Sequence, residues 1–492
     1  MPLKLPAVNL FAIMPEISMT VLVCLVILVD LFVPQRRKAL LGLLTLFGVI
    51  VTGLLTLPLI GMEASLFSDM YRVDSFAIFF KFIFLAITAL TVLISLRYLS
   101  IEEIHLGEYY ALVLFSVIGM MVMAGGSDLL TIYIGLELLS IPIYILVGFM
   151  KRDLLSQEGG VKYFLLGAFS SGIILYGIAL AYGITGTTNL AAMHAAFGET
   201  TGPNILLTLS VIMIVAGFAF KIALVPFHMW APDAYQGAPT SITAFMSVGT
   251  KAAAFAALLR IFAVAFEGIA GQWVILLWLL AVFSMTWGNI AAMVQPNLKR
   301  LLAYSSVAHA GYVMIGLVVG SEIGMASVLL YLAIYTFMNM GAFTMVILLC
   351  RQNFRGDQVE DFRGLARAHP LAGIGFLIFF LSLAGLPPTA GFVGKFYLFS
   401  AAIESGYIWL ALIGVLNSVL SVYYYFKVVV NMYMAEPAGK VKISTSVPLR
   451  LALGLMVVGV ILIGIYPDPL LSAVKASVAP FFQGASAIAL VP

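Results

Sequence analysis

Apolar runs of about twenty residues follow one another along almost the whole chain, and this feature leaves few folds open. Only 10% of the residues are charged and the mean hydropathy is +1.11, whereas soluble domains usually carry about 25% charge. Lipid offers no hydrogen bonds to an exposed backbone, so consecutive spans of this length must be helical. We therefore expect an all-α polytopic membrane protein. The net charge of +3 is too small and too dispersed to indicate nucleic-acid binding.

Counting apolar runs of about 17–25 residues between polar breaks predicts about 14 transmembrane helices. These spans lie near residues 8–33, 39–60, 75–96, 109–125, 128–149, 159–183, 204–236, 238–266, 272–294, 300–319, 325–349, 370–400, 406–433 and 447–466.

The basic residues outside the spans support this count independently. Three of them, Lys4, Arg72 and Lys475, fall on one side of the predicted topology, and fifteen fall on the other. Because cytoplasmic loops carry the excess of Lys and Arg, both termini are predicted to face the periplasm or its equivalent. The fifteen are Arg36, Arg37, Lys38, Arg97, Lys151, Arg152, Lys299, Arg300, Arg351, Arg355, Arg363, Arg367, Lys440, Lys442 and Arg450.

Seven basic residues remain inside the predicted spans, and six of them are lysines. They are Lys81, Lys162, Lys221, Lys251, Arg260, Lys395 and Lys427. A desolvated lysine can give up its proton, whereas an arginine essentially never does. Lys81, Arg260 and Lys427, like Glu16 and Asp30, lie close to span ends, where a long side chain can reach the headgroups. We expect those residues to have no role in proton transfer.

Two spans are unusually long and are interrupted by proline. Residues 204–236 contain Pro226 and Pro232, and residues 370–400 contain the pair Pro387 and Pro388. Proline removes a backbone hydrogen bond, so each span is predicted to contain a discontinuous helix buried in protein or lining a wet cavity. The two broken spans are the seventh and the twelfth. Their odd separation predicts two five-helix repeats of inverted topology.

This pattern divides the chain into four parts. Residues 1–107 form three N-terminal transmembrane helices, and residues 108–270 form a first half with the break at 204–236. Residues 271–435 form the second, inverted half with the break at 370–400, and residues 436–492 contain the last span and a tail.

Glu137, Lys221 and Lys251 lie near the middle of their spans, where a charge costs about 2.5–3.5 kcal/mol on insertion scales. A structural ion pair is the alternative to a proton-handling role. In general a carboxylate beside a buried amine favours the charged amine, and withdrawing the carboxylate favours proton release. Glu137 and the lysines are therefore candidates for a proton path.

Further candidates lie on the broken and adjacent spans. His228 lies in the first break, Lys395 follows the second break, and His309 lies in the middle of the tenth span. Histidine titrates near neutral pH, although a membrane histidine is often only a hydrogen-bonded core residue. Lys162 is a few residues inside its span, so a headgroup-facing position is an equal alternative for it.

The sequence contains no pattern for a resident cofactor or metal. Cys24 and Cys350 cannot supply the four thiolates of an iron–sulfur cluster, and no C-x-x-C-H haem motif, G-x-G-x-x-G motif, metal-binding His pair or Ser–His–Asp order occurs. The stretch GFVGKF around Lys395 lacks the Ser or Thr of a phosphate loop. Tyr423, Tyr424 and Tyr425, near a span end, are predicted to form part of an interfacial aromatic belt.

Four stretches in order resemble the antiporter-like membrane subunits of respiratory complex I and of the multisubunit cation/proton antiporters. They are GLELLSIPIY around Glu137, FKIALVPFHMWAPDAYQGAPT around Lys221, QPNLKRLLAYSSVAHAGY ending near His309, and SLAGLPPTAGFVGKFY around Lys395. The resemblance covers spans 4–13. The two larger antiporter-like subunits of complex I usually carry an acidic residue and a His where this chain has Tyr235-Gln236-Gly237, which favours the third such subunit; the plastoquinone-linked homologue has similar motifs.

The resemblance implies that Glu137 and Lys221, with Lys162 nearby, form the modulating pair of a first proton half-channel. It implies that Lys251 and His309 connect to Lys395 in a second half-channel, with internal water completing the path. The flavin (FMN), iron–sulfur clusters and quinone site of such a proton-translocating NADH:quinone oxidoreductase would lie in partner subunits, including other antiporter-like chains. A multisubunit Na⁺/H⁺ antiporter subunit and a structural membrane spacer are the alternatives.

Overall fold

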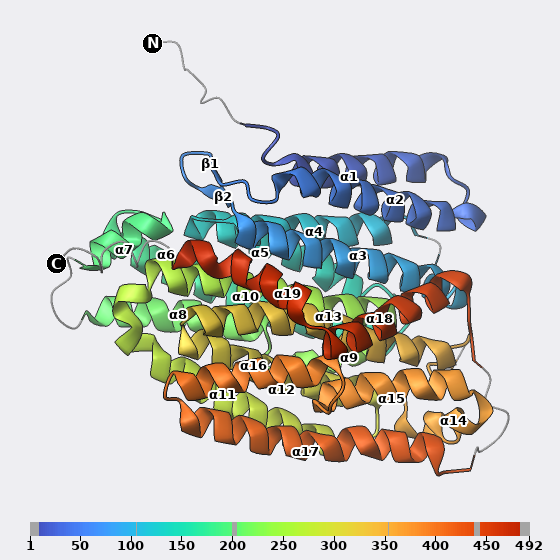
Figure 1. Ribbon diagram of the computed structural model, residues 1–492. Helices are drawn as coiled ribbons and strands as arrows, with labels where there is room; N and C mark the ends of the chain where they lie inside the picture. Colours follow the sequence, from blue (N-terminus) through green and yellow to red (C-terminus); the bar gives the residue numbers. More distant parts are fainter. Residues whose placement is uncertain (1–8, 105, 199–203, 353, 437–442, 483–492) are drawn as a thin grey trace.

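The computed structural model describes residues 9–104, 106–198, 204–352, 354–436 and 443–482. Long helices lie side by side across the molecule, with α1 and α2 at one edge and α11 and α17 at the other (Figure 1). Twelve helices of the described residues are long and apolar enough to cross a membrane. The all-α polytopic fold is thus confirmed, while the count of 14 spans stays a prediction. Lys4, Lys440 and Lys442, which entered the charge count, lie outside the described residues.

The helices up to the first break are α1 (Met14–Phe32), α2 (Ala39–Thr56), α3 (Ser75–Ile101), α4 (Glu108–Gly125), α5 (Leu129–Val147), α6 (Leu154–Thr185), α7 (Leu190–Gly198) and α8 (Ile205–Lys221). Those between the breaks are α9 (Ala231–Gly237), α10 (Thr240–Arg260), α11 (Ala270–Met293), α12 (Leu298–Val319), α13 (Glu322–Leu349), α14 (Leu365–Ala368) and α15 (Pro370–Ala384). Those after the second break are α16 (Ala390–Glu404), α17 (Ile408–Tyr433), α18 (Val447–Ile465) and α19 (Asp468–Val478). Short 3₁₀ or π turns are η1 (Gln35–Arg37), η2 (Leu57–Leu59), η3 (Ile261–Ala265), η4 (Glu267–Ile269), η5 (Val359–Phe362) and η6 (Ala479–Phe481).

Both predicted interruptions are present. α8 ends at Lys221, residues 222–230 are not helical, and α9 then begins with Pro232 in its first turn. α15 ends at Ala384, residues 385–389 are not helical, and α16 follows. Proline cannot donate the hydrogen bond that would continue each helix, so the clusters end α8 and α15 where the sequence predicts. The inverted relation between the two halves stays a prediction.

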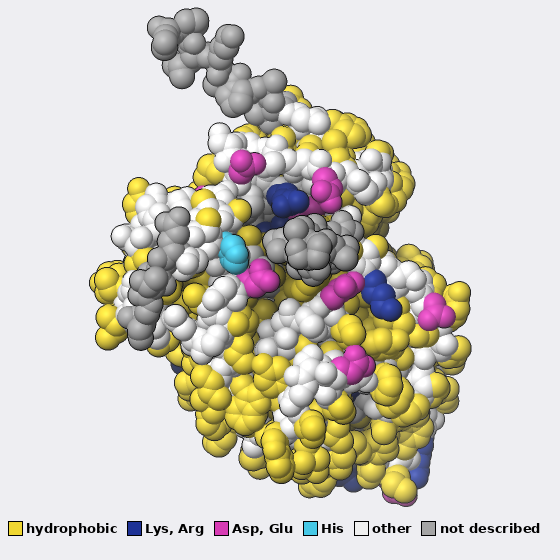
Figure 2. Space-filling model, turned by 60° about the vertical axis from the view of Figure 1, so that its left-hand side comes forward, with side chains coloured by type: hydrophobic (Ala, Val, Ile, Leu, Met, Phe, Trp, Pro, Cys, Tyr) yellow, Lys and Arg dark blue, Asp and Glu magenta, His cyan; other side chains and the backbone are white. Residues whose placement is uncertain are grey.

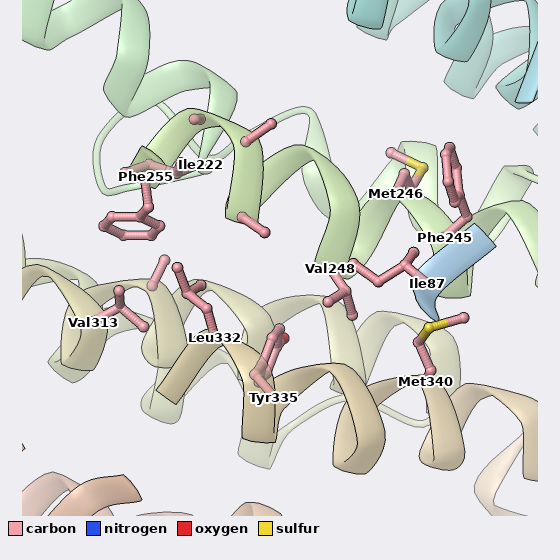
Figure 3. Close-up of a cluster of buried hydrophobic side chains, with 14 of the residues drawn as sticks. Ile87, Ile222, Phe245, Met246, Val248, Phe255, Val313, Leu332, Tyr335 and Met340 are labelled. Carbon is pink, nitrogen blue, oxygen red and sulfur yellow. The ribbon is translucent and has the colours of Figure 1, made fainter. Parts of the chain in front are cut away.

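The helix α10 forms the centre of the molecule, because every residue from Thr240 to Arg260 is buried. Its side chains Val248 and Phe255 point toward Leu332 and Tyr335 of α13 (Figure 3). α10 also packs against α5, α8 and α12. A side chain near the middle of α10 is therefore surrounded by protein and does not face lipid.

A small hairpin between α2 and α3 was not predicted. Strands β1 (Ala64–Leu66) and β2 (Tyr71–Val73) pair antiparallel, with Ser65 opposite Arg72. Tyr71 also bridges to Gly126 after α4, so the hairpin joins the N-terminal helices to the first half. Strands of three residues are too short for an alternating pattern to be visible in a sequence.

The expectation that Lys81 and Arg260 reach the headgroups is wrong. Lys81 is fully buried and its Nζ lies 2.8 Å from Glu16 Oε1. Arg260 is also buried and donates two hydrogen bonds to Asp74, with N–O distances of 2.8 and 3.0 Å. Both partners lie far away in the sequence, so position within a span could not reveal them. Lys427 is exposed on α17, and Asp30 forms an ion pair with Lys38.

The guanidinium of Arg260 is also covered by two aromatic rings. Phe76 of α3 and Phe481 of η6 lie 5.0 and 5.6 Å from it. Phe481 follows directly after α19, which packs against both α3 and α13. The last described helix thus completes the surroundings of the Arg260–Asp74 pair.

The predicted aromatic belt at residues 423–425 is wrong for two of its three members. Tyr423 is 63% exposed, whereas Tyr424 and Tyr425 are both fully buried. Successive positions on a helix point about 100° apart, so three adjacent tyrosines cannot all face the membrane surface. Tyr424 and Tyr425 instead face the interior of the second half.

Candidate functional site

Lys221 is the last residue of α8 and lies directly before the first break. Its Nζ donates hydrogen bonds to Ser140 Oγ at 2.9 Å and Tyr144 Oη at 2.8 Å, both on α5. Only 4% of the residue is exposed, so the amine does not reach the surface. A buried amine is therefore held by two neutral hydroxyl groups.

Glu137 lies one helical turn before Ser140 on the same face of α5. Its Oε1 is buried without a hydrogen-bond partner, and no ion pair within the described residues joins it to Lys221. Ser140 and Tyr144 occupy the amine instead. A direct Glu137–Lys221 contact is therefore absent from the described residues in this conformation, although both residues lie close to Ser140, Glu137 on the same helix and Lys221 through a hydrogen bond.

Lys162 occupies a different position, near the start of α6. Its Nζ forms ion pairs with Glu158, at 2.5 Å, and with Asp233 of α9, at 2.7 Å. Asp233 in turn pairs with Arg300 at 2.6 Å. The side chain of Lys162 is 43% exposed. Lys162 thus ties α6 to the second helix of the broken span and does not touch Lys221 in this structure.

Lys251 lies in the middle of α10 and is 2% exposed. Its Nζ donates to both the carbonyl oxygen and the hydroxyl of Ser306 on α12. The lysine that the sequence places at the centre of the chain therefore contacts the helix that carries His309, three residues further on. Its hydrogen-bond partners are again neutral.

Lys395 lies on α16, five residues after this helix begins, and it reaches back across the second break. Its Nζ donates to the carbonyl oxygens of Leu383 at 3.1 Å and Ala384 at 2.9 Å, and to Ser418 Oγ at 2.8 Å. The first two are terminal carbonyls of α15, which lack partners within their own helix. The Tyr312 ring lies 4.9 Å from the amine. The broken helix thus supplies the acceptors that a buried lysine needs.

The two histidines lie in different surroundings. His228, in the irregular segment between α8 and α9, is 4% exposed, and its ring centre lies 6.3 Å from that of Tyr304. His309 lies on α12 between two tyrosines: its Nδ1 is 2.6 Å from Tyr331 Oη and its Nε2 is 3.1 Å from Tyr425 Oη. In the described part of the chain no hydrogen bond joins His228 to another candidate residue.

Sequence reasoning missed the hydroxyl partners of the lysines. Ser140, Ser306 and Ser418 each accept a hydrogen bond from one buried amine. A signal was available, because serine inside an apolar span is a polar group that needs a partner. The sequence could not show which lysine each serine would meet, since the two residues lie on different helices.

The described residues contain no group of three His, Cys, Asp or Glu side chains that could hold a metal ion. Cys350 follows directly after α13, and its Sγ donates to Glu102 Oε1 at 3.3 Å. Burial, together with the neighbouring Glu102 carboxylate, raises the pKa of the Cys350 thiol well above its ordinary value. Because the thiolate is the metal-binding form, Cys350 is poorly suited to be a ligand.

Comparisons with known proteins agree with this architecture. The family model described as NADH:quinone oxidoreductase/Mrp antiporter, TM, matches residues 126–421. A chain of Trichlorobacter lovleyi named NADH-quinone oxidoreductase subunit N is 48% identical over 473 residues, which cover 96% of this chain and 97% of that relative.

Two solved structures are also similar. A chain of respiratory complex I from Thermus thermophilus has a TM-score of 0.80 and 33% identity, with 94% of this chain and 100% of that chain covered. A chain of the Mrp complex from a Dietzia species has a TM-score of 0.84 at 21% identity, with 97% and 98% covered, which is a likeness of fold alone.

The fold and the buried amines define a class, the antiporter-like polytopic membrane subunits. This chain belongs to the NADH:quinone oxidoreductase/Mrp antiporter membrane family. Within it, curated relatives that are 42–48% identical over most of the chain bear the name NADH-quinone oxidoreductase subunit N. This agrees with the assignment favoured by Tyr235-Gln236-Gly237.

Proposed function

We propose that this chain is the proton-translocating membrane subunit, corresponding to subunit N, of a proton-pumping NADH:quinone oxidoreductase. One observation carries the proposal: Lys221, Lys251 and Lys395 are buried, and in the described residues each of them has only neutral hydrogen-bond partners. A buried charge with a purely structural role would be paired with an opposite charge. Leaving it unpaired in the protein interior costs roughly several kcal/mol.

Such amines can serve as proton carriers because their charged form is not fixed by a counterion. Lys221 would act in a first half-channel under the influence of Glu137, and Lys395 would act in the second, with Lys251 and His309 between them. Residues 108–270 and 271–435 would be the corresponding halves. Lys162 and His228 would have supporting roles, and internal water would complete the path between side chains.

The energy for transport would come from redox chemistry in other subunits. FMN, iron–sulfur clusters and the quinone site would belong to those partners, and this chain would contribute only the translocase part. Other antiporter-like membrane subunits would contact it directly. The positive-inside count supports an inner-membrane location with periplasmic termini.

The alternative is a subunit of a multisubunit Na⁺/H⁺ antiporter, since the Mrp chain has the same fold. The names of relatives at 42–48% identity favour the oxidoreductase. Detergent extraction separates the two: co-purification with flavin and iron–sulfur subunits and NADH–quinone activity supports our proposal, whereas co-purification with antiporter subunits alone contradicts it.

The sharpest test keeps the charge and removes the ability to release a proton. We predict that Lys221→Arg and Lys395→Arg each lower proton pumping by about a factor of ten or more while the complex still assembles. Pumping is measured in membrane vesicles with a pH-sensitive dye, and assembly by native gel electrophoresis. Lys427→Arg, on the exposed face of α17, is the matched control and should leave pumping unchanged. Full pumping by both interior variants would contradict the proposal.

A further inference from the structure

A cluster of buried hydroxyl groups surrounds His309 and has no part in the function proposed so far. Tyr331 Oη lies 2.6 Å from Nδ1 of the ring, and Tyr425 Oη lies 3.1 Å from Nε2. Tyr425 Oη also shares a hydrogen bond with Ser305 Oγ, one turn before His309 on α12. Both tyrosines are fully buried. Among the described residues, each ring nitrogen of His309 therefore has a tyrosine hydroxyl as its hydrogen-bond partner.

A hydroxyl can both donate and accept, and this property matters here. If Nδ1 carries the proton, Tyr331 accepts and Tyr425 donates to Nε2. If Nε2 carries it, Tyr331 donates to Nδ1, while Tyr425 accepts and donates to Ser305. If both nitrogens are protonated, both tyrosines accept. Rotation of O–H bonds alone thus gives each ring nitrogen a hydroxyl partner in all three states, and no ring or backbone atom has to move.

The imidazole ring is also held in its plane by aromatic neighbours. The ring centres of Tyr335 and Tyr312 lie 5.2 and 5.7 Å from that of His309. A ring packed in this way cannot turn over to present a different nitrogen to each side. A change of proton position at His309 must therefore occur in place.

The two ends of this cluster lie beside the two lysines. Ser305 is adjacent to Ser306, which accepts hydrogen bonds from Lys251. Tyr331 packs against the backbone of the residue before Lys395: a Cβ added to Gly394 would lie 2.7 Å from the Tyr331 ring. Lys251 on α10 and Lys395 on α16 are thus the basic groups on either side. The other titratable groups facing the ring are tyrosines of α12, α13 and α17.

We propose that Tyr331 and Tyr425 are positioning residues that hold His309 in one orientation in every protonation state, so that it can gain and lose a proton in place between Lys251 and Lys395. Uptake breaks an N–H bond of a neighbouring lysine ammonium and forms an N–H bond at the free ring nitrogen: the tyrosine hydroxyl there gives its proton to the ring and regains one from the lysine through internal water, which leaves a neutral amine and the imidazolium. Release breaks an N–H bond at either nitrogen and returns that proton to the other lysine by the same exchange. This inference rests on the proposed proton-translocating function and names residues that it did not include.

The first test removes the hydroxyl groups in the intact complex. We expect Tyr425→Phe and Tyr331→Phe each to lower proton pumping by about tenfold, because a ring nitrogen loses its only partner. Tyr109→Phe is the matched control: Tyr109 is equally buried, on α4, and its hydroxyl shares hydrogen bonds with Ser95 at 2.8 Å and Ser241 at 2.7 Å. The control should retain pumping within about twofold. Equal pumping by all three variants at normal assembly overturns the inference.

The second test distinguishes positioning from packing. Incorporation of 3-fluorotyrosine at position 425 keeps the ring and the hydroxyl but makes the phenol more acidic. We expect the pH profile of coupled turnover to shift with this residue at 425 and to stay unchanged with it at 109. An unchanged profile at both positions overturns the inference, since a structural role depends on shape alone.

The outcome of the lysine variants separates this inference from the function on which it rests. If Lys395→Arg abolishes pumping and Tyr425→Phe does not, only the role of the tyrosines is wrong. If the Lys395→Arg and Lys221→Arg variants pump normally, the proposed function is wrong, and the inference about the tyrosines is then wrong as well. Native gels on every variant exclude loss of assembly as the cause.

Discussion

Interior basic residues of this chain fall into two groups that differ in their partners. Arg260 is bound by both carboxylate oxygens of Asp74, and an arginine in such a pair stays charged. Lys221, Lys251 and Lys395 have hydroxyls and carbonyls as partners instead. Only the second group can change its charge without leaving a carboxylate unpaired. For these four residues, residue type and partner together separate the structural charge from the proton-handling candidates.

The Arg260–Asp74 pair leads to a pH prediction. Burial alone would raise the pKa of Asp74, but the charge and hydrogen bonds of Arg260 outweigh it and the pKa is lowered. A lowered folded-state pKa stabilises the protein above the ordinary Asp value of about 3.9, and this stabilisation is lost as the pH falls through the folded value. We expect the melting temperature of the purified complex to fall in that acid window, and Asp74→Asn to be less stable at neutral pH.

The neutral-pH effect of Asp74→Asn should be about 3–5 kcal/mol, because the guanidinium is left buried without its counterion. Glu63→Gln is the control, since Glu63 is 56% exposed and lies 3.9 Å from the exposed Arg72. Thermal unfolding followed by tryptophan fluorescence reports both. An Asp74→Asn complex as stable at pH 7 as the unmodified one would show that the pair is not structural.

The depth of a charged residue could be predicted from the sequence, but its partners could not. Counting positions along the spans located Lys221, Lys251 and Lys395 in the interior, where the structure finds them buried. The same counting wrongly predicted that Arg260 reaches the headgroups. Its partner Asp74 lies 186 residues earlier, so the sequence around Arg260 gave no sign of the ion pair. Such a contact depends on how helices pack, and apolar periodicity carries no information about it when nearly every face of a helix is hydrophobic.

At the scale of elements, the second helix break provides hydrogen-bond acceptors for a lysine that follows it. The C-terminal carbonyls of α15 would be unsatisfied in a helix that simply stopped, and Lys395 takes two of them. Gly385 makes this return possible: its φ of +84° is a conformation that side chains rarely adopt. The position is also crowded, since an added Cβ would lie 2.7 Å from Lys395 Cδ.

Gly385→Ala should therefore act on the lysine through the backbone. The change adds strain of about 1–2 kcal/mol from the left-handed conformation, and it pushes the Lys395 side chain away from its acceptors. We expect reduced pumping at near-normal assembly, measured in vesicles as for the lysine variants. Gly454→Ala on α18, where an added Cβ meets no atom within 4 Å, should retain normal pumping. Comparable losses in both variants would contradict a local effect.

Proline and glycine clusters predicted both breaks, because these residues act on their own helix and need no distant partner. The hairpin of β1 and β2 was missed for the opposite reason. Its strands of three residues are fixed by contacts such as the bridge from Tyr71 to Gly126, which joins two separate loops. Elements that depend on residues within their own segment can thus be predicted from the sequence. Elements that depend on contacts with distant segments cannot.

At the scale of the whole molecule, hydrophobic side chains cover wide areas of the outer surface (Figure 2). Leu154, Phe169 and Trp409 are 79%, 73% and 72% exposed. Soluble monomers rarely expose contiguous apolar patches beyond a few hundred Å². The surface therefore suits lipid and neighbouring membrane subunits, in agreement with the family to which the chain belongs.

The predicted orientation can be tested by labelling single cysteines in a background where exposed Cys24 is replaced by Ser. Ser68 in the β1–β2 turn and Arg152 between α5 and α6 are both exposed. We expect Ser68→Cys to react with a membrane-impermeant maleimide in intact spheroplasts, and Arg152→Cys to react only after the membrane is opened. Labelling of Arg152→Cys alone in intact spheroplasts would reverse the orientation.

The position of α19 has a consequence for how the molecule is made. This helix packs against α3, and the Phe481 ring that follows it covers the Arg260 guanidinium. During translation, every helix from α1 to α18 is synthesised before that ring exists. The side of the Arg260 guanidinium that Phe481 covers therefore stays open until synthesis has reached Phe481.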